Sequence, residues 1–564
     1  MPPFAFPYLL ELADAHLPHL LQALSLRLLE LLHRYGDTPS SEAGTTSARR
    51  RVARQGQNQV ESYFRATTTS YAPPPPPRLR RAPRLFVCAM RELSWQLDGD
   101  TNVSGPGPRL GVLSIPSAEP GQEPHTLATP ACLTYTRRGE PAHLTPDVLR
   151  TLPAEARAFQ VCLTHFMDHL PHTHVSECPG GGATYFGSAP FFHLATARDA
   201  ITFDLNAKPS NDPNSVFVGT PVGVKKLCVE EYMRWVRAVQ PSAFVQLADE
   251  HFSATNVNGK KTKAAVKRTA EWLDRCDEAR GGEKNENNDD GDGDERKNIP
   301  MFACITGGAC PASREESASA ATAKGDSVFG FSIGGLGTGE SPGAKRGALL
   351  DAALKPLPRN KPRHVAGVSS PLEVLDLINK GVDLVDNSFC HTVTTAGKAL
   401  WFPVESGDDC FTEKKDHGAS GDGKKDDGDT KSFGDGEGQK KKRRVDTASD
   451  DVSTSDADAD AIDARLSNGT DAFTLNIWSL AYRMDGRPLV ANCQCATCKN
   501  HTRSYLHHLA QCREMTLSVL LDVHNTFHYL TFFKAARTAI GNGTFDAFVE
   551  FHRKRADKTI SYQR

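Results

Sequence analysis

The amino-acid sequence predicts an α/β fold, a (β/α)8 (TIM) barrel with a helical C-terminal appendix and disordered insertions. Short apolar runs alternate with amphipathic helical segments through the middle of the chain, which is typical of a parallel sheet with right-handed crossovers. Residues 84–402 and 472–560 together exceed the ~250 residues that such a barrel needs. The alternation of strands and helices by itself also allows a doubly wound open sheet.

The expected barrel elements run from residue 227 to residue 385. Helical spacing of apolar residues predicts helices at 227–239, 263–280 and 371–380. Short apolar runs predict buried strands at 243–247, 301–305, 328–333 and 382–385, and the segment 364–368 leads into the third helix. From residue 502 onward, apolar residues recur at steps of three and four. That spacing predicts a packed helical appendix and not a further βα unit.

Three polar segments are predicted to be linkers or disordered insertions. Residues 36–83 are rich in Ser, Arg and Pro, and their run Pro73–Pro77 is typical of a stiff linker. Residues 279–298 and 404–471 carry too few apolar side chains to offset the entropy of ordering. The basic run Lys440–Arg444 resembles a nuclear-import motif, and a charge-balancing patch among aspartates is the alternative.

Residues 1–35 are predicted to form an amphipathic helix with a kink at Pro18. A docking or packing helix is the expectation, and a membrane-surface helix is the alternative. No apolar run is long enough for a transmembrane helix, and no secretory signal peptide is present. The net charge of −2 means that any nucleic-acid contact must come from a local basic surface.

Three of the 14 cysteines form a tight cluster, Cys493, Cys495 and Cys498, in the segment ANCQCATCKNH. The other cysteines are irregularly spaced, which favours a reducing compartment. Three thiolates this close favour a soft tetrahedral metal, and zinc is the usual occupant. Spacing alone does not choose the fourth ligand, for which the candidates are His501, His507, His508, Cys512, His524 and His528.

The segment CQCATCKNHTRSYLHHL, followed by EMTLSVLLDVHN, resembles the zinc-binding C-terminus of the tRNA-guanine transglycosylase family. Further matches are AHLTPDVL around His143, EWLDRC ending at Cys276, GGLGTGE at Gly334–Glu340 and PRHVAGVSSPLEVLDLINKGVDLVD at Pro362–Asp386. The resemblance covers most of residues 130–402 and 475–540. It implies one structural zinc ion per subunit, held by the three cysteines and by the histidine of the HN pair, His524.

Enzymes of this family exchange a guanine of the tRNA anticodon for another base. One carboxylate attacks the ribose C1′, a second handles protons, and the target base is flipped into a pocket. The resemblance places the nucleophile at Asp386 in GVDLVD. The region that matches the second acid's DSGG motif reads PACLTYTRRGEPAHLT and contains no aspartate.

Other family positions also differ. A base-reading glutamine–glycine pair is matched by Thr306–Gly307, and an arginine-containing segment after the nucleophile is matched by HTVTTAG at His391–Gly397. Asp249 in QLADE is the candidate for a base-reading acid. A lone nucleophile without its proton-transfer partner is expected to be nearly inert. Asp386 is therefore expected to be a vestige in a protein without catalytic residues.

The resemblance thus implies a non-catalytic accessory subunit. It is expected to form a heterodimer with a catalytic queuine tRNA-ribosyltransferase subunit and to help hold tRNA. The complex would exchange guanine for queuine at the wobble position of tRNAs with GUN anticodons. The alternatives are an active transglycosylase that uses Asp386 with a relocated acid, and a regulatory or nucleic-acid module. The expected location is the cytoplasm, with peripheral association at the mitochondrial outer membrane as a further option.

Overall fold

The computed structural model describes only part of the chain, and all of that part lies in one compact unit, Cys88–Arg564. The described residues are 93–98, 107–116, 124–178, 181–188, 191–201, 212–250, 259–280, 299–337, 344–405 and 472–562. The expected N-terminal helix, the linker 36–83 and the basic run Lys440–Arg444 lie outside them. So do nearly all of the expected insertions 279–298 and 404–471.

Eight parallel strands close into a barrel, in the order β4-β5-β6-β9-β10-β11-β12-β13, and β13 pairs with β4. The strands are β4 (Ala131–Tyr135), β5 (Ala158–Cys162), β6 (Phe192–Thr196), β9 (Ala243–Val245), β10 (Met301–Ile305), β11 (Gly330–Ile333), β12 (Arg363–Val365) and β13 (Leu384–Asp386). This closure confirms the predicted (β/α)8 barrel and excludes the open doubly wound sheet.

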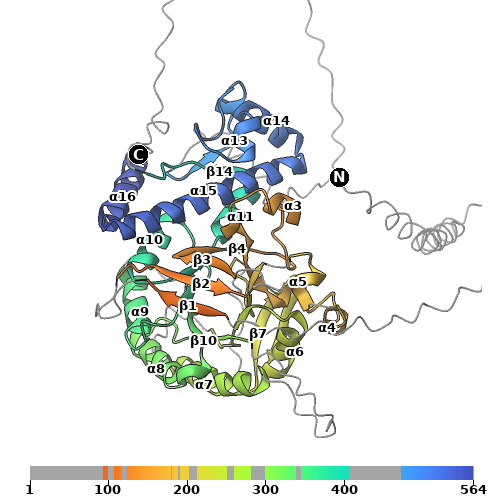
Figure 1. Cartoon of the computed structure of the whole chain (residues 1–564), viewed down its shortest axis with the longest axis vertical. Coiled ribbons are helices and arrows are strands. Elements are labelled where there is room, and N and C mark those ends of the chain that lie inside the picture. The colour runs from red at the N-terminus through yellow and green to blue at the C-terminus, as the bar shows by residue number, and fades with distance from the viewer. Residues whose placement is uncertain are drawn as a thin grey trace, which may run out of the picture. The chain divides into compact units, whose positions relative to one another are not determined.

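Helices follow the later strands and surround the barrel (Figure 1). They are α6 (Val229–Val239), α7 (Lys260–Arg280), α8 (Pro311–Thr322), α9 (Ala344–Leu354), α10 (Pro371–Asn379) and α11 (Ser388–Thr395). In α10, Pro371 occupies the first turn, where its missing N–H costs no intrahelical bond. The apolar residues of α10 are buried on one face of the helix, so the sequence periodicity explains how it docks on the barrel.

The early crossovers are less regular. Between β4 and β5 lie α3 (Pro146–Leu149) and η1 (Ala154–Arg157), and between β5 and β6 lie η2 (Leu163–His165), α4 (His172–Ser176) and α5 (Gly181–Tyr185). A hairpin of β7 (Ser215–Thr220) and β8 (Gly223–Cys228) precedes α6, and η3 (Gly325–Ser327) precedes β11.

An antiparallel sheet of β1 (Ser94–Leu97), β2 (Gly111–Ile115) and β3 (His125–Thr129) leads directly into β4. Leu113 and Leu127 of this sheet belong to one buried cluster with the barrel-lining residues Leu133, Leu194 and Phe302. The sheet therefore covers the end of the barrel at which the strands begin. The opposite end, where parallel strands terminate, is left for a site.

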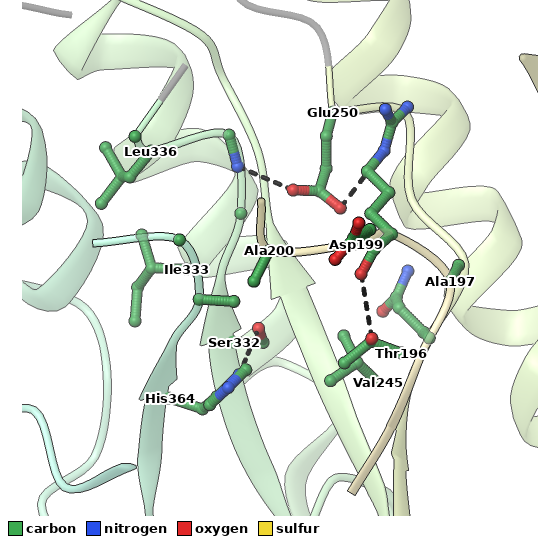
Figure 2. Close-up of a pocket in the computed structure, with 17 residues that line it drawn as sticks. Thr196, Ala197, Asp199, Ala200, Val245, Glu250, Ser332, Ile333, Leu336 and His364 are labelled. Atoms are coloured by element: carbon green, nitrogen blue, oxygen red, sulfur yellow. Dashed lines mark hydrogen bonds and ion pairs between the residues drawn. The ribbon is translucent and has the colours of Figure 1, made fainter. Parts of the chain in front are cut away.

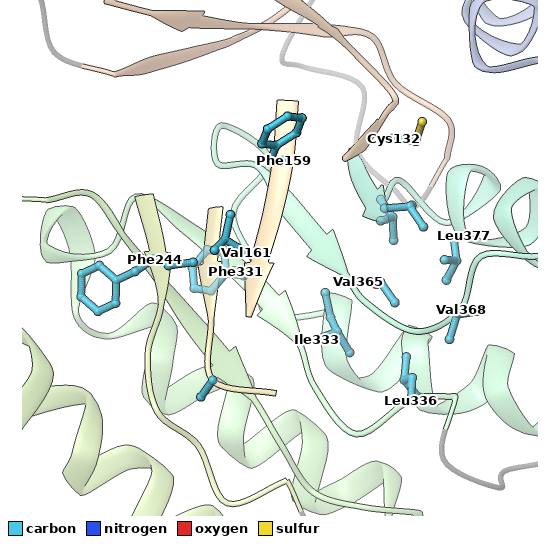
Figure 3. Close-up of a cluster of buried hydrophobic side chains, with 14 of the residues drawn as sticks. Cys132, Phe159, Val161, Phe244, Phe331, Ile333, Leu336, Val365, Val368 and Leu377 are labelled. Carbon is cyan, nitrogen blue, oxygen red and sulfur yellow. The ribbon is translucent and has the colours of Figure 1, made fainter. Parts of the chain in front are cut away.

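A larger apolar core lies between the strands and the surrounding helices (Figure 3). Phe159, Val161, Phe244, Phe331 and Ile333 point outward from the strands into this layer, and each is at most 1% exposed. Inward and outward side chains alternate along the strands, as β-strand geometry requires. Because the strands are packed on both faces, their ends are held in place, and so are the residues that follow them at the barrel mouth.

The C-terminal part forms a second layer above α11 and β4 (Figure 1). It contains β14 (Lys398–Leu400), β15 (Thr474–Asn476), η5 (Leu480–Tyr482), α13 (Ala496–Asn500), α14 (Arg503–Cys512), α15 (Met515–Gly541) and α16 (Phe545–Tyr562). The predicted helical appendix is present as three helices. Backbone residues with left-handed φ interrupt it, Arg513 at 55° and Gly543 at 68°.

Several predicted boundaries differ from the structure. The helix expected at 227–239 begins at Val229, because Leu227 and Cys228 complete the pairing of β8 with β7. Ala279 and Arg280, expected at the start of an insertion, are the last residues of α7. In β13, strand pairing continues to Asp386, one residue beyond the expected end of that strand.

Candidate functional site

The structure brings Cys493, Cys495, Cys498 and His524 together, with their ligand atoms all within 4.8 Å of one another. The three Sγ atoms lie 3.8, 3.5 and 3.3 Å from His524 Nδ1. A tetrahedral ion with Zn–S of ~2.3 Å and Zn–N of ~2.0–2.1 Å would place each sulfur about 3.6 Å from the nitrogen. The donor set and its spacing therefore fit a structural zinc ion.

The imidazole of His524 is oriented by the neighbouring strand. Its Nε2 lies 2.9 Å from the carbonyl oxygen of Leu400 in β14. A carbonyl only accepts, so Nε2 carries the proton and Nδ1 presents its lone pair to the cysteines. The next residue, Asn525, accepts a hydrogen bond from the Leu400 N–H at 2.7 Å and donates to Thr394 Oγ1 and the Lys398 carbonyl. The HN pair thus joins α15 to β14 at the metal cluster.

The other candidates for a fourth ligand have different environments. His528 donates to the Phe402 carbonyl at 2.9 Å, and His507 bonds to the Ile477 carbonyl at 2.8 Å. His501 stacks on Tyr505, and His508 lies beside the exposed Cys512. None of these residues joins the cluster around the three cysteines.

A small cavity opens where the barrel strands end (Figure 2). Its lining comes from the ends of β6, β9, β11 and β12 and from the loops that follow them. The cavity has a volume of about 50 Å³, compared with ~300–1,000 Å³ for typical small-molecule sites. Neither Asp386 nor Asp249 is among the residues that line it.

Asp386 ends β13 and is fully buried. Its two carboxylate oxygens accept hydrogen bonds from backbone N–H groups, Oδ2 from Gly367 at 2.6 Å and Oδ1 from Ser388 at 2.7 Å. Burial raises the pKa of Asp386, and these donors act in the opposite direction. The carboxylate therefore closes the β13–α11 turn against the loop after β12.

Glu250 and Arg198 both line the cavity and form an ion pair, with Nε and Oε1 3.5 Å apart. The other oxygen of Glu250 accepts from the Gly335 N–H at 2.7 Å. A Cβ on Gly334 would lie 2.7 Å from this carboxylate, so the first glycine of GGLGTGE provides the space for it. The preceding acid, Asp249, is ion-paired with Arg268 of α7 and is almost completely buried.

Tyr135 ends β4, in the region that matches the motif of the missing catalytic acid. Its hydroxyl donates to Asp199 Oδ1 at 2.7 Å, and His165 Nε2 lies 3.5 Å from Asp199 Oδ2. Burial and the neighbouring Asp199 carboxylate keep the Tyr135 pKa far above its ordinary value, so the phenol stays protonated. Asp199 is thus held between two side chains at the edge of the cavity.

Below the cavity, Gln160, His364 and Ser332 form a buried hydrogen-bonded row. His364 Nε2 lies 3.1 Å from Gln160 Oε1, and its Nδ1 lies 3.0 Å from Ser332 Oγ. Burial lowers the pKa of His364 to about 3, so the imidazole is neutral at pH 7. Ser332 and His364 of this row line the cavity.

Sequence reasoning did not identify Arg198, Asp199 or Glu250. Arg198 and Asp199 follow the strand FHLAT, and Glu250 follows Asp249 in QLADE. Charged residues directly after buried strands are a usable signal in a barrel. The strand before Arg198 and Asp199 was not predicted, whereas the strand before Glu250 was predicted at 243–247, so the signal was available for Glu250 alone. Thr306 and Gly307 follow β10, and Arg314 packs against Gly307.

Comparison with known proteins gives consistent matches. The family profile for queuine tRNA-ribosyltransferase matches residues 105–557. Proteins named queuine tRNA-ribosyltransferase accessory subunit 2 match from Danio rerio, at 31% identity over 80% of this chain and 98% of the relative, and from Xenopus tropicalis, at 28% over 80% and 97%. The Homo sapiens protein of that name is 29% identical over 74% of this chain and 90% of its own length. Among the described helices, none is long and apolar enough to cross a membrane.

Proposed function

The chain belongs to the queuine tRNA-ribosyltransferase family, and from this membership we propose that it is the non-catalytic subunit of a tRNA-guanine transglycosylase. The complex exchanges guanine for queuine at the wobble position of tRNAs with GUN anticodons. This chain contributes no catalytic residue. Its partner, a catalytic queuine tRNA-ribosyltransferase subunit, supplies the chemistry in a heterodimer.

The burial of Asp386 carries this proposal. A nucleophile must approach the ribose C1′ to about 3–3.5 Å. Both oxygens of Asp386 accept short bonds from backbone N–H groups, and the side chain is inaccessible. Exposing it would require the loop after β12 to move away from the turn after β13. The aspartate therefore serves as a structural connector of two barrel loops.

The remaining mouth residues support the same conclusion. Arg198 and Glu250 occupy the mouth with their ion pair, and a cavity of about 50 Å³ holds only a few water molecules. Asp249 is neutralised by Arg268 and faces α7. Tyr135 keeps its proton and is bonded to Asp199. The described residues of the mouth therefore form neither a base-sized pocket nor an accessible pair of carboxylates.

The metal cluster supports a structural role in the C-terminal part. Cys493, Cys495, Cys498 and His524 would hold one zinc ion, and all four tetrahedral positions would be filled by protein. The ion would stabilise the junction of the cysteine loop, α15 and β14. No open position for a catalytic water follows from this donor set.

An exposed apolar patch on the same part of the molecule supports assembly with a partner. Leu480 and Met484 are 63% and 84% exposed, and Tyr505 is 41% exposed. Hydrogen bonds from Ser504 to the carbonyls of Arg483 and Asp485 hold η5 and α14 together, so these residues share one surface. Clustered exposed apolar side chains of this kind are typical of protein interfaces. We place the catalytic subunit on this patch.

The test is guanine-for-queuine exchange on a GUN-anticodon tRNA, with the zinc-loaded full chain, the catalytic subunit, and both together. Exchange is expected only when the catalytic subunit is present, and Asp386→Asn in this chain should leave the rate within about twofold. If this chain alone turns over and Asp386→Asn abolishes that turnover, the chain is an active transglycosylase instead.

Assembly is tested separately by Leu480→Glu with Met484→Glu. Two buried charges at an interface should weaken association with the catalytic subunit at least about 100-fold. Val222→Glu is the matched control, because Val222 is 64% exposed but lies at the tip of the β7–β8 hairpin. The assigned interface would be wrong if Val222→Glu weakened association as much as the patch variant does, or if the patch variant did not weaken association.

We also propose that the protein is located in the cytoplasm and associates peripherally with the mitochondrial outer membrane. The test is fractionation of cells that express the full chain, compared with cells that express a chain that starts at residue 36. Loss of a mitochondrial fraction only in the shortened chain would assign membrane association to residues 1–35.

A further inference from the structure

The turn that follows β4 presents two adjacent arginines at the barrel mouth. The Arg137 N–H bonds to the Glu140 carbonyl at 2.8 Å, and Arg138 and Gly139 have left-handed φ values of 58° and 96°. Positive φ at both central positions is the geometry of a type I′ hairpin turn, which favours Asn and Gly. Arginine at such a position is conformationally costly, and backbone outliers of this kind suggest a functional constraint.

Among the described residues, no carboxylate pairs with the guanidinium of Arg137 or of Arg138. Both side chains are exposed, and no ion pair to either is formed within the described parts of the chain. By contrast, the nearby Arg198 and Arg268 are both paired with carboxylates. Two unpaired neighbouring cations on a rigid turn repel each other, and an anion would relieve that repulsion.

Aromatic side chains pack under and beside this turn. A Cβ on Gly139 would lie 2.9 Å from the ring of Phe186, so the turn rests directly on that ring. Phe186 in turn stacks on Phe166 at 4.9 Å between ring centroids. Tyr185 sits edge-on to Phe186 at 5.2 Å and is 42% exposed. An accessible aromatic ring therefore packs against the ring on which the turn rests.

A second aromatic group lies close enough to Arg137 to be influenced by its charge. The imidazoles of His143 and His391 are stacked 5.7 Å apart, with 10° between their planes, and His391 contacts the ring of Tyr135. Burial, with a smaller contribution from Arg137, lowers the pKa of His143 and lowers that of His391 to about 4. Both rings are thus uncharged at pH 7.

We propose that Arg137, Arg138 and Tyr185 form a binding surface for single-stranded RNA, with the two arginines on phosphates and the tyrosine against a base. Cations interleaved with exposed aromatic rings are the usual means of holding single strands without reading their sequence. The inference rests on the proposed function, because the strand concerned is the part of tRNA that approaches this subunit. It assigns the accessory subunit its own contact to the RNA.

An RNA strand fits this surface better than a protein segment does. The apolar patch assigned to the protein partner lies on η5 and α14, and it carries the exposed leucine and methionine that protein interfaces use. The turn after β4 offers unpaired positive charge with one exposed tyrosine. A strand with one phosphate per nucleotide and flat bases matches both features.

The test measures binding of an unmodified GUN-anticodon tRNA transcript, and of a single-stranded oligouridylate of about ten nucleotides, to the full zinc-loaded chain across a salt series. Arg137→Gln with Arg138→Asn should reduce the slope of log K against log salt by about 1.4, since each phosphate contact to a single strand contributes ~0.7. Asparagine tolerates the left-handed backbone, so the turn is preserved.

Tyr185→Ala should weaken binding at least about fivefold at every salt concentration without changing the slope, and Tyr185→Phe should retain affinity. The matched control is Lys267→Gln with Arg275→Gln, which removes the same charge from α7. It should leave the slope unchanged. Thermal melting of each variant verifies that the fold is intact.

An unchanged salt slope in the double arginine variant would overturn the inference, as would an equal change in the α7 control. If the double arginine variant assembled less well with the catalytic subunit but bound RNA unchanged, the turn would be a protein contact, and the inference would also be overturned. The proposed function fails by a different result, namely no association of the wild-type chain with the catalytic subunit. RNA binding by the chain alone does not depend on that association.

Discussion

We expect Asn525→Ala to destabilise the protein and, together with that, to weaken zinc binding at the proposed site of three cysteines and His524. Asn525 is fully buried, accepts from the Leu400 N–H at 2.7 Å and donates to two oxygens. Alanine leaves the Leu400 N–H without its acceptor and removes both donated bonds, a cost of about 2–4 kcal/mol. The Leu400 carbonyl would then orient His524 less firmly, and loss of such outer partners lowers metal affinity about 10–100-fold.

The assay is zinc release to a chromogenic chelator, together with urea unfolding of the zinc-loaded chain. Thr526→Ala is the control, because its hydroxyl bonds to Asp522 in the same helix and not to β14. Asn525→Ala should release zinc at chelator concentrations about tenfold lower than wild type, and Thr526→Ala should not. Destabilisation with unchanged zinc affinity would refute the link between Asn525 and the metal site.

Three further outcomes are expected. Asp386→Asn leaves one of the Gly367 and Ser388 N–H groups without an acceptor, so urea unfolding should show a loss of about 1–3 kcal/mol while exchange by the complex persists. Arg109→Met strips the buried Asp383 of its ion-pair partner and should cost about 3–5 kcal/mol, whereas the double variant Arg109→Met with Asp383→Leu should recover much of that loss. The pKa of His364 falls to about 3 on folding, so its contribution to the free energy of unfolding is complete above about pH 6.5 and is lost as the pH drops toward 3, by about 1.4 kcal/mol per pH unit. In urea unfolding between pH 7.5 and 5, His364→Gln should reduce the dependence of that free energy on pH. An unchanged pH dependence would contradict the assignment.

Much of the fold could be predicted because the later barrel elements are regular. The strand at Met301–Ile305 was predicted with its observed bounds, and α10 differs from its prediction by one residue. Continuous apolar runs are typical of strands that are buried on both faces. The early strands β4, β5 and β6 were not predicted. Short helices and 3-10 turns separate them, so no helical period marks the crossovers.

The site was predictable only where neighbouring residues carry it. Cys493, Cys495 and Cys498 are close in sequence, but spacing left six candidates for the fourth ligand, and only the family resemblance indicated His524. Folding of α15 against β14 selects His524, since the Leu400 carbonyl points its Nδ1 toward the cysteines. The ion pair of Arg198 with Glu250 joins loops that are about 50 residues apart in sequence, a contact that no local pattern indicates.

The antiparallel pairing of β14 with β15 has a consequence for how the chain can vary in length. Leu400 lies opposite Thr474, so the two ends of the intervening segment are held at a fixed separation by strand pairing and by the α15 contacts to Leu400. Closing a loop whose ends are already fixed costs only ~0.6 kcal/mol for each doubling of its length. The chain between Glu405 and Ala472 can therefore change in length at little entropic cost to the pairing of β14 with β15. A protease cut within that segment would leave two fragments that remain associated as one particle.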